Sequence, residues 1–206
     1  MLKIQMMTNT EFCEALRSVL NVKTRYAKGG YGCYASEGNV NFLSRLYQSW
    51  YHEKRKKELV GSGAYLFDCV CFIKSVLNGW NGSLDDHFGG SKPGKIVADV
   101  GTEAIMRVPH STNYDTDFST LLPGCILHKP GHVGVYLGNS EVIECAWDSS
   151  GGGVRISKFD GKWDSHARLA CITYEEAVDN PVGNVQIPCT WDPVKKVLTI
   201  SLDGVV

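Results

Sequence analysis

The order of hydrophobic patterns along the chain most limits its possible folds. The first half places apolar residues at helical spacing, for example over 10–20 and 68–79. The second half changes to short alternating segments, of which 132–137 and 142–147 flank a turn at 138–140. Helices that precede an antiparallel meander are typical of an α+β fold. The pattern therefore predicts that class.

The same patterns predict the individual elements. We expect helices over 10–20, 40–57 and 68–79, a short helix over 98–108, and strands over 125–128, 132–137, 142–147, 154–156, 169–174 and 197–202. We expect loops over 26–34, 81–95 and 109–119 because these stretches are rich in Gly, Asp, Ser or other polar residues.

Charge and cysteine usage narrow the possible functions. Lys and Arg number 21 against 22 Asp and Glu, so no net field attracts nucleic acid or an anionic membrane. No apolar run reaches the roughly 18 residues of a membrane helix. The start of the chain does not resemble a secretory signal, so we expect synthesis in the cytoplasm and reduced thiols. The 8 cysteines lack a C-x-x-C pair, and we expect neither a metal nor an organic cofactor.

One cysteine and one histidine stand out as chemically useful. Cys69 lies at the predicted first turn of a helix with Asp68 at the N-cap. Free backbone N–H groups there favour a thiolate, which predicts a lowered thiol pKa, and can also hold an oxyanion. His132 begins a strand, and Gly134 lies two positions after it. Glu144 lies in an apolar strand, where it is either exposed or orients a base; its position alone does not decide.

The hairpin register decides whether Glu144 can serve His132. A three-residue loop over 138–140 pairs Leu137 with Glu141 and Val135 with Ile143, and it places Glu144 on the face of His132. A two-residue loop over 139–140 would instead pair Val135 with Glu144 and place the carboxylate on the face away from His132. We expect the first register because it satisfies both packing and chemistry.

Three blocks of sequence carry recognisable motifs. Residues 24–30 (TRYAKGG) match T-x-Y-x-x-G-G, and residues 68–72 (DCVCF) match D-C-x-G-F at all but one position. Residues 122–124 (LPG) and 131–139 (GHVGVYLGN) match a Pro-Gly strand followed by an H-V-G-[IV]-Y-L-G-[ND] hairpin. In this order, over about 10–174, the blocks resemble the NlpC-type cell-wall cysteine peptidases, and more closely the phage endolysins among them.

The resemblance implies a papain-like fold, with the cysteine helix packed on a small antiparallel sheet. It implies hydrolysis of amide bonds in peptidoglycan stem peptides, without a cofactor. Cys69 matches the nucleophile, His132 the general base and Glu144 the third polar residue. Tyr26 matches a tyrosine that lines the site and helps the oxyanion, and Asp68 matches an aspartate that contacts the substrate's amino group or caps the helix.

The sequence departs from the family in several places. The third residue is usually His, Asn or Gln; an acidic Glu144 resembles the related CHAP amidases and leaves endopeptidase and amidase activity open. Cys71 replaces a glycine, and Cys125 replaces an aspartate after Pro-Gly. The stretch 31–67 is longer than usual, and we interpret it as a helical insertion that forms one wall of the cleft.

We therefore expect a peptidoglycan hydrolase domain over 1–174, monomeric and bacteriolytic. Residues 175–206 contain proline breakers and are expected to form a C-terminal extension, either a β-hairpin or a linker. Such an enzyme would act on the cell wall after release, as a phage lysin or a virion-associated protein. Two alternatives remain: a papain-like deamidase or acyltransferase acting on a protein, and a non-catalytic virion or wall-binding module.

Overall fold

The computed structural model describes residues 6–84, 86–175, 189–192 and 197–200. The chain divides into two compact units, 1–176 and 177–206. In the second unit, β12 (Cys189–Asp192) and β13 (Val197–Ile200) pair as an antiparallel hairpin. The first unit contains, in chain order, β1 (Met7–Thr8), α1 (Asn9–Ser18), β2 (Thr24–Tyr26), β3 (Tyr31–Tyr34), α2 (Glu37–Leu46), α3 (Glu53–Leu59), β4 (Tyr65–Phe67), α4 (Cys69–Leu77), α5 (Thr102–Ile105), β5 (Ser111–Asp115), β6 (Ile126–Lys129), β7 (His132–Gly138), β8 (Glu141–Ala146), β9 (Gly153–Lys158), β10 (Ser165–Leu169) and β11 (Ile172–Thr173).

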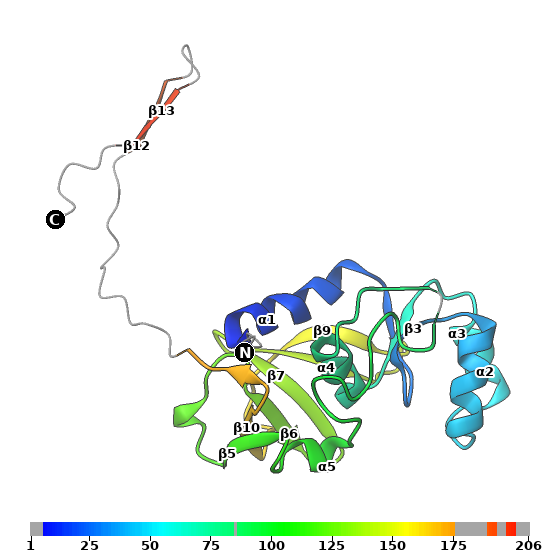
Figure 1. Cartoon of the computed structure of the whole chain (residues 1–206). Helices are drawn as coiled ribbons and strands as arrows, with labels where there is room; N and C mark the ends of the chain where they lie inside the picture. The colour runs from blue at the N-terminus through cyan, green and yellow to red at the C-terminus, as the bar shows by residue number, and fades with distance from the viewer. Residues whose placement is uncertain (1–5, 85, 176–188, 193–196, 201–206) are drawn as a thin grey trace, which may run out of the picture. The chain divides into compact units, whose positions relative to one another are not determined.

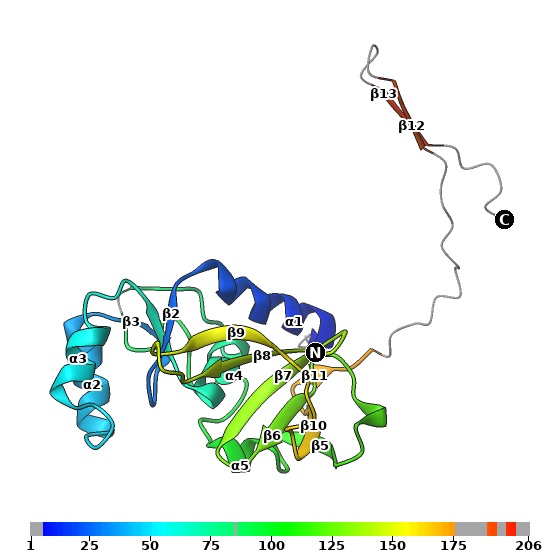
Figure 2. The same ribbon diagram turned by 180° about the vertical axis from the view of Figure 1, so that it is seen from behind.

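A six-stranded antiparallel sheet forms the larger part of the first unit. Its strand order is β5-β10-β6-β7-β8-β9, so β6 to β9 form the predicted meander. Helix α4 packs against β7 and β8, in front of the sheet in Figure 1 and behind it in Figure 2. Among the described residues, no helix is long and apolar enough to cross a membrane. The α+β class and the helix-on-sheet arrangement are confirmed.

Helix α4 is the buried centre of this unit. The Asp68 carboxylate accepts a hydrogen bond from the Cys71 N–H at 2.7 Å and so satisfies one of the free donors at the helix start. All nine residues of the helix are buried. The helix ends before Gly79, whose φ of +88° suits glycine. The predicted helix over 68–79 and its cap are confirmed.

A second, three-stranded sheet joins segments that are far apart in the sequence. Strand β4 lies between β2, which runs parallel to it, and β3, which runs antiparallel. The prediction of a loop over 26–34 is therefore wrong for β3. Beyond this sheet, the Ala35 N–H donates to the Ala64 carbonyl at 2.9 Å. The two ends of the stretch 36–63 thus lie side by side.

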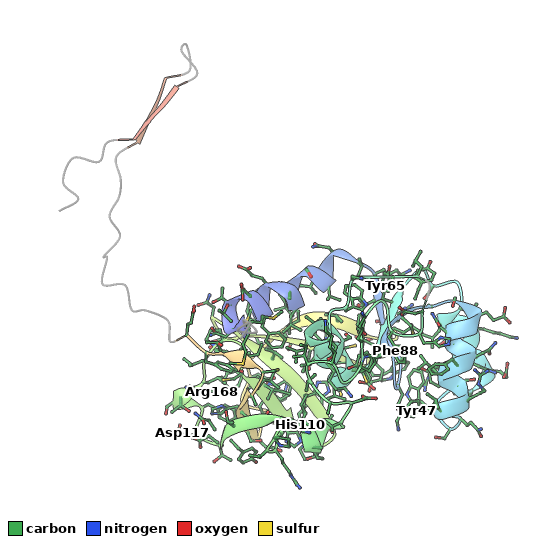
Figure 3. The ribbon with its side chains drawn as sticks, viewed as in Figure 1. Tyr47, Tyr65, Phe88, His110, Asp117 and Arg168 are labelled. Carbon is green, nitrogen blue, oxygen red and sulfur yellow. The ribbon has the colours of Figure 1, made fainter. Side chains whose placement is uncertain are left out.

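The helix predicted over 40–57 is wrong as a single element, because the structure breaks it into α2 and α3. Ser36 caps the first helix, and the His52 side chain caps the second by accepting from the Arg55 N–H at 3.3 Å. Tyr47 leaves helical geometry at the end of α2 (Figure 3). This break lets Tyr51 turn inward, where it is 4% exposed and its hydroxyl donates to the Lys28 carbonyl at 2.9 Å.

The β7–β8 hairpin has the predicted Val135–Ile143 pair but a different turn. Gly138, not Leu137, pairs with Glu141, so the loop is the two residues Asn139 and Ser140. Both loop residues have positive φ, and the ladder contains a bulge between Tyr136 and Gly138. The extra residue in the bulge offsets the shorter loop and preserves the expected faces of the strands.

Three further predictions need correction. The helix expected over 98–108 is reduced to α5, and the loop expected over 109–119 contains β5, which pairs with β10. The strand expected over 169–174 is wrong, because β10 ends at Leu169, where that strand was expected to begin, and β11 pairs with β1. The two strand corrections involve short strands whose partners are distant in the sequence.

Candidate active site

Cys69 is the first residue of α4 and faces the sheet. Its side chain is 5% exposed and packs in the main core. The thiol lies close enough to hydrogen-bond the backbone at Val133, the residue that follows His132 at the start of β7. The structure thus brings the predicted nucleophile to the backbone beside the predicted base.

The predicted low pKa of the Cys69 thiol is wrong. Burial, followed by the negative charge of Asp68, raises this pKa to about 11. Hydrogen bonds from the backbone at Val133 and Val70 act in the opposite direction but do not outweigh burial. The sequence predicts that Cys69 starts a helix, but it does not show how deeply the thiol is buried. At neutral pH the resting side chain is therefore a thiol, and its reaction needs a base.

His132 and Glu144 form a hydrogen-bonded pair across the β7–β8 hairpin. His132 Nε2 lies 2.6 Å from Glu144 Oε2. This contact places the carboxylate on the face of the imidazole, as the expected register requires. Because Nε2 is held by the carboxylate, Nδ1 is the ring nitrogen left for proton exchange.

The Glu144 carboxylate is buried but well partnered. It is 7% exposed, and Arg155 Nε lies 3.5 Å from its Oε1. Burial alone would raise its pKa. The hydrogen bond and charge of His132, the Ser157 hydroxyl and the charge of Arg155 outweigh burial and lower the pKa from 4.5 to about 2. Glu144 is therefore ionised at neutral pH.

This pKa predicts an acid-dependent contribution of Glu144 to stability. The folded pKa of about 2 lies below the ordinary 4.5, so the stabilisation is fully present above about pH 4.5 and is lost as the pH falls towards 2. We expect the difference in free energy of unfolding between wild type and Glu144→Gln to shrink over that range in denaturant titrations. Glu14→Gln, on the exposed face of α1, should show no such trend. A difference that stays constant from pH 6 to pH 3 would contradict the prediction.

Trp163 holds the other side of the His132 ring, and the sequence analysis did not predict this role. The two rings stack with centroids 5.6 Å apart and an interplanar angle of 21°. A Cβ on Gly134 would lie 3.0 Å from the Trp163 ring, so this glycine gives the indole its space. The Lys129 ammonium lies 4.8 Å from the Trp163 centroid. Glycine at 134 was the only sequence signal for such a close approach.

A groove of about 480 Å³ opens beside the histidine. Tyr26, His132, Glu144, Trp147 and Trp163 line it. Its remaining lining residues are Lys129, Ala146, Arg155, Ser157, Lys158, Asp160 and Lys162. The predicted site residues His132, Glu144 and Tyr26 thus share one concave surface.

Tyr26 connects Cys69 to an aromatic cluster. Burial, and then the nearby Cys69 and Asp68 charges, raise the pKa of the Tyr26 hydroxyl, so it remains a proton donor. Its ring centroid lies 6.2 Å from that of Trp50 and 6.3 Å from that of Trp147. Trp147 is 45% exposed, so part of this cluster faces solvent.

Asp68 performs the capping role that the sequence left as one of two alternatives. One oxygen accepts from the Cys71 N–H, and the other accepts from the Gly29 N–H at 2.8 Å. The second bond ties the Gly-Gly end of the first motif to the cysteine helix. Each oxygen of this carboxylate already has a backbone partner.

The other histidines and cysteines lie in different surroundings. His128 pairs with Glu103 at 2.9 Å, and His166 is 2% exposed beside the Asp117 carbonyl. Figure 3 shows His110 and Asp117 at the β5 and α5 end of the molecule. Cys71, which replaces the family's glycine, is a core residue and is 7% exposed. Among the described residues, no group of three or more His, Cys, Asp or Glu side chains could hold a metal ion.

Comparison with known proteins finds similarity in structure alone. No protein-family model and no curated protein matches the chain. NlpC1 from Trichomonas vaginalis is 15% identical with a TM-score of 0.43, over 80% of this chain and 45% of that one. The P60 domain of antigen MAP1204 from M. avium subspecies paratuberculosis is 17% identical with a TM-score of 0.41, over 76% of this chain and 96% of that one. The peptidoglycan hydrolase RipB from Mycobacterium tuberculosis is 15% identical with a TM-score of 0.40, over 79% of this chain and 67% of that one.

The chain therefore spans less than half the length of NlpC1. NlpC1 and the P60 domain carry names of the family that the sequence motifs resemble. All three TM-scores are below 0.5, so the roles assigned below rest on the motifs and geometry of this chain.

Proposed function

We propose that the chain is a cysteine hydrolase that cleaves amide bonds in the stem peptides of peptidoglycan. One observation carries the proposal: the thiol at the start of α4 meets the backbone beside His132, and Nε2 of that histidine is held at 2.6 Å by Glu144. A nucleophile, a base and an orienting carboxylate in this order form the arrangement used for acyl transfer.

The reaction divides into two steps on the chain's own residues. His132 Nδ1 takes the proton of the Cys69 thiol as sulfur attacks the amide carbon, and the protonated ring then gives that proton to the leaving amine. Water, deprotonated by the same nitrogen, attacks the acyl carbon, the C–S bond breaks to release a carboxylic acid, and the imidazolium returns its proton to the departing Cys69 thiolate. Glu144 stabilises the transient imidazolium and fixes the ring. The Cys69 N–H at the helix start and the Tyr26 hydroxyl are the donors proposed for the oxyanion.

The charge of the groove supports an acidic peptide substrate. Four cationic side chains line it against two carboxylates, Glu144 and Asp160, so the lining carries an excess of positive charge. The four cations are Lys129, Arg155, Lys158 and Lys162. Stem peptides of peptidoglycan carry free carboxylates, which such a surface attracts. The motifs over 24–30, 68–72 and 131–139 point to the same substrate class by resemblance.

Digestion of purified peptidoglycan, followed by mass spectrometry of the soluble products, tests the proposal. We expect fragments with a new amino terminus inside the stem peptide, or a free lactyl-glycan end if the enzyme is an amidase. Because His132, Glu144 and Cys69 suffice for the chemistry, a chelator should leave the rate unchanged. Deamidation of a protein target without release of wall fragments would refute the peptidoglycan assignment. Loss of activity on chelation, restored by zinc, would refute the thiol mechanism.

A further inference from the structure

A second pocket of about 490 Å³ adjoins the groove, because Trp147 lines both. Its other walls come from α3 and from the loop that follows β8. We call it the α3 pocket. Its lining residues are Arg25, His52, Lys54, Arg55, Glu58, Leu59, Trp147 and 149–151. The mechanism above uses none of the residues of this pocket.

Arg55 is fixed in this pocket by two indole rings. Its guanidinium carbon lies 4.1 Å from the Trp50 ring centroid and 4.6 Å from that of Trp147. One of its N–H groups donates to the Trp50 carbonyl at 2.9 Å. A guanidinium stacked in this way loses little further freedom on binding a ligand, and its other N–H groups remain donors.

Arg25 reaches the pocket from the opposite side. It donates to the Ser150 carbonyl, and a Cβ on Gly151 would lie 2.4 Å from its Nη1. The Asp148 carboxylate fixes this loop, since it accepts from the Ser150 N–H at 2.8 Å and the Gly152 N–H at 3.0 Å. The loop therefore holds the Arg25 side chain in place, and Gly151 leaves space for that side chain because glycine has no Cβ.

The charge of the pocket is unbalanced. Arg25, Lys54 and Arg55 face a single carboxylate, that of Glu58. Within residues 6–84 and 86–175, neither Arg25 nor Arg55 has a carboxylate within salt-bridge distance, although elsewhere Arg17 has one and Arg155 has two. Two half-buried guanidinium groups without a counter-ion are the donors that suit a planar oxyanion.

We propose that the α3 pocket binds a free carboxylate of the stem peptide whose amide bond lies at Cys69. This inference rests on the proposed function, and it names which wall peptides the enzyme prefers. A carboxylate is favoured over a wall phosphate because the pocket shares Trp147 with the catalytic groove, so a single peptide can follow both. Acidic stems would then bind more tightly than stems in which that carboxylate is amidated.

Calorimetric titration of the full chain carrying Cys69→Ala tests this without turnover. The probes are a synthetic stem tetrapeptide with free carboxylates and the same peptide with its carboxylates amidated. We expect the acidic form to bind about 10-fold more tightly. Arg55→Met should remove most of that preference by weakening the acidic form alone. The matched control is Lys57→Gln, an exposed cation on the same helix that does not line the pocket, and it should preserve the preference.

Arg25→Gln is a second variant from the opposite wall, for use if Arg55→Met lowers the melting temperature. It should cause the same selective loss. Equal weakening of both peptides by either folded variant, or no weakening, would overturn the proposal. Selective loss seen only with wall that carries phosphodiester polymers, and never with the peptide, would overturn it as well.

Failure of the carboxylate assignment can be distinguished from failure of the proposed function. If wild-type protein releases fragments from peptidoglycan and the two peptides bind equally, only the carboxylate assignment fails. If no fragments appear while the acidic peptide still binds selectively through Arg55, the hydrolase assignment fails and the anion pocket stands.

Discussion

Cys69→Ala and Cys69→Ser are expected to reduce peptidoglycan hydrolysis by at least about 1,000-fold, because either change removes the thiol that would carry the acyl intermediate. The fold should survive, since each change removes or replaces one atom at a helix start whose cap is Asp68. Fragment release measures the activity, and circular dichroism with thermal melting checks the fold.

Two controls make this prediction specific to one thiol. Cys71→Ala, two residues further along the same buried helix, should keep most of the activity. Iodoacetamide should inactivate wild type faster as the pH rises from 7 to 10, because burial raises the pKa of Cys69 to about 11. An active Cys69→Ala variant beside an inactive Cys71→Ala or Cys145→Ala would show that the nucleophile is misassigned.

The second largest loss is expected at Glu144. Glu144→Ala removes the acceptor that holds His132 Nε2 at 2.6 Å, and we expect kcat to fall about 100-fold while KM changes little. Glu144→Gln should lose only about 10-fold, because its amide oxygen can still accept from Nε2–H. Steady-state kinetics on a soluble stem peptide separate kcat from KM.

The chain offers a matched control for this carboxylate. Glu103 makes a comparable contact with His128, at 2.9 Å, but neither residue lines the groove. Glu103→Gln should therefore leave kcat unchanged. If Glu144→Ala raised KM at constant kcat, Glu144 would be a substrate contact and not a positioning residue for His132.

The parts of the fold that the sequence predicts are those encoded by neighbouring residues. Asp68 before an apolar run predicts the start of α4, and the alternation on either side of Asn139 predicts the β7–β8 hairpin. The β2-β4-β3 sheet escapes prediction because it pairs strands of three or four residues from distant segments. Helical spacing also continues across Tyr47, and only tertiary contacts of Tyr51 reveal the break.

The same distinction between local and tertiary features applies to the candidate site. Cys69 and His132 stand in motifs, and the hairpin register predicts that Glu144 lies on the face of His132, so their mutual approach could be expected from the sequence. The pKa of Cys69 could not, because it depends on how deeply the helix start is buried. Trp163 stacks on His132, and Trp50 and Trp147 enclose the Arg55 guanidinium. These tryptophans and Arg55 lie outside the motifs, so the sequence does not predict the contacts.

The backbone hydrogen bond between Ala35 and Ala64 has an evolutionary consequence. It joins the two ends of the segment 36–63, which contains α2 and α3. The chain therefore leaves and re-enters the small sheet at nearly the same point. Insertions, deletions or exchange of residues 36–63 would leave the spacing of Cys69 and His132 intact. Related proteins could thus differ in which wall peptides they recognise while keeping one unchanged catalytic centre. An engineered segment from another protein could likewise be inserted between Ala35 and Ala64.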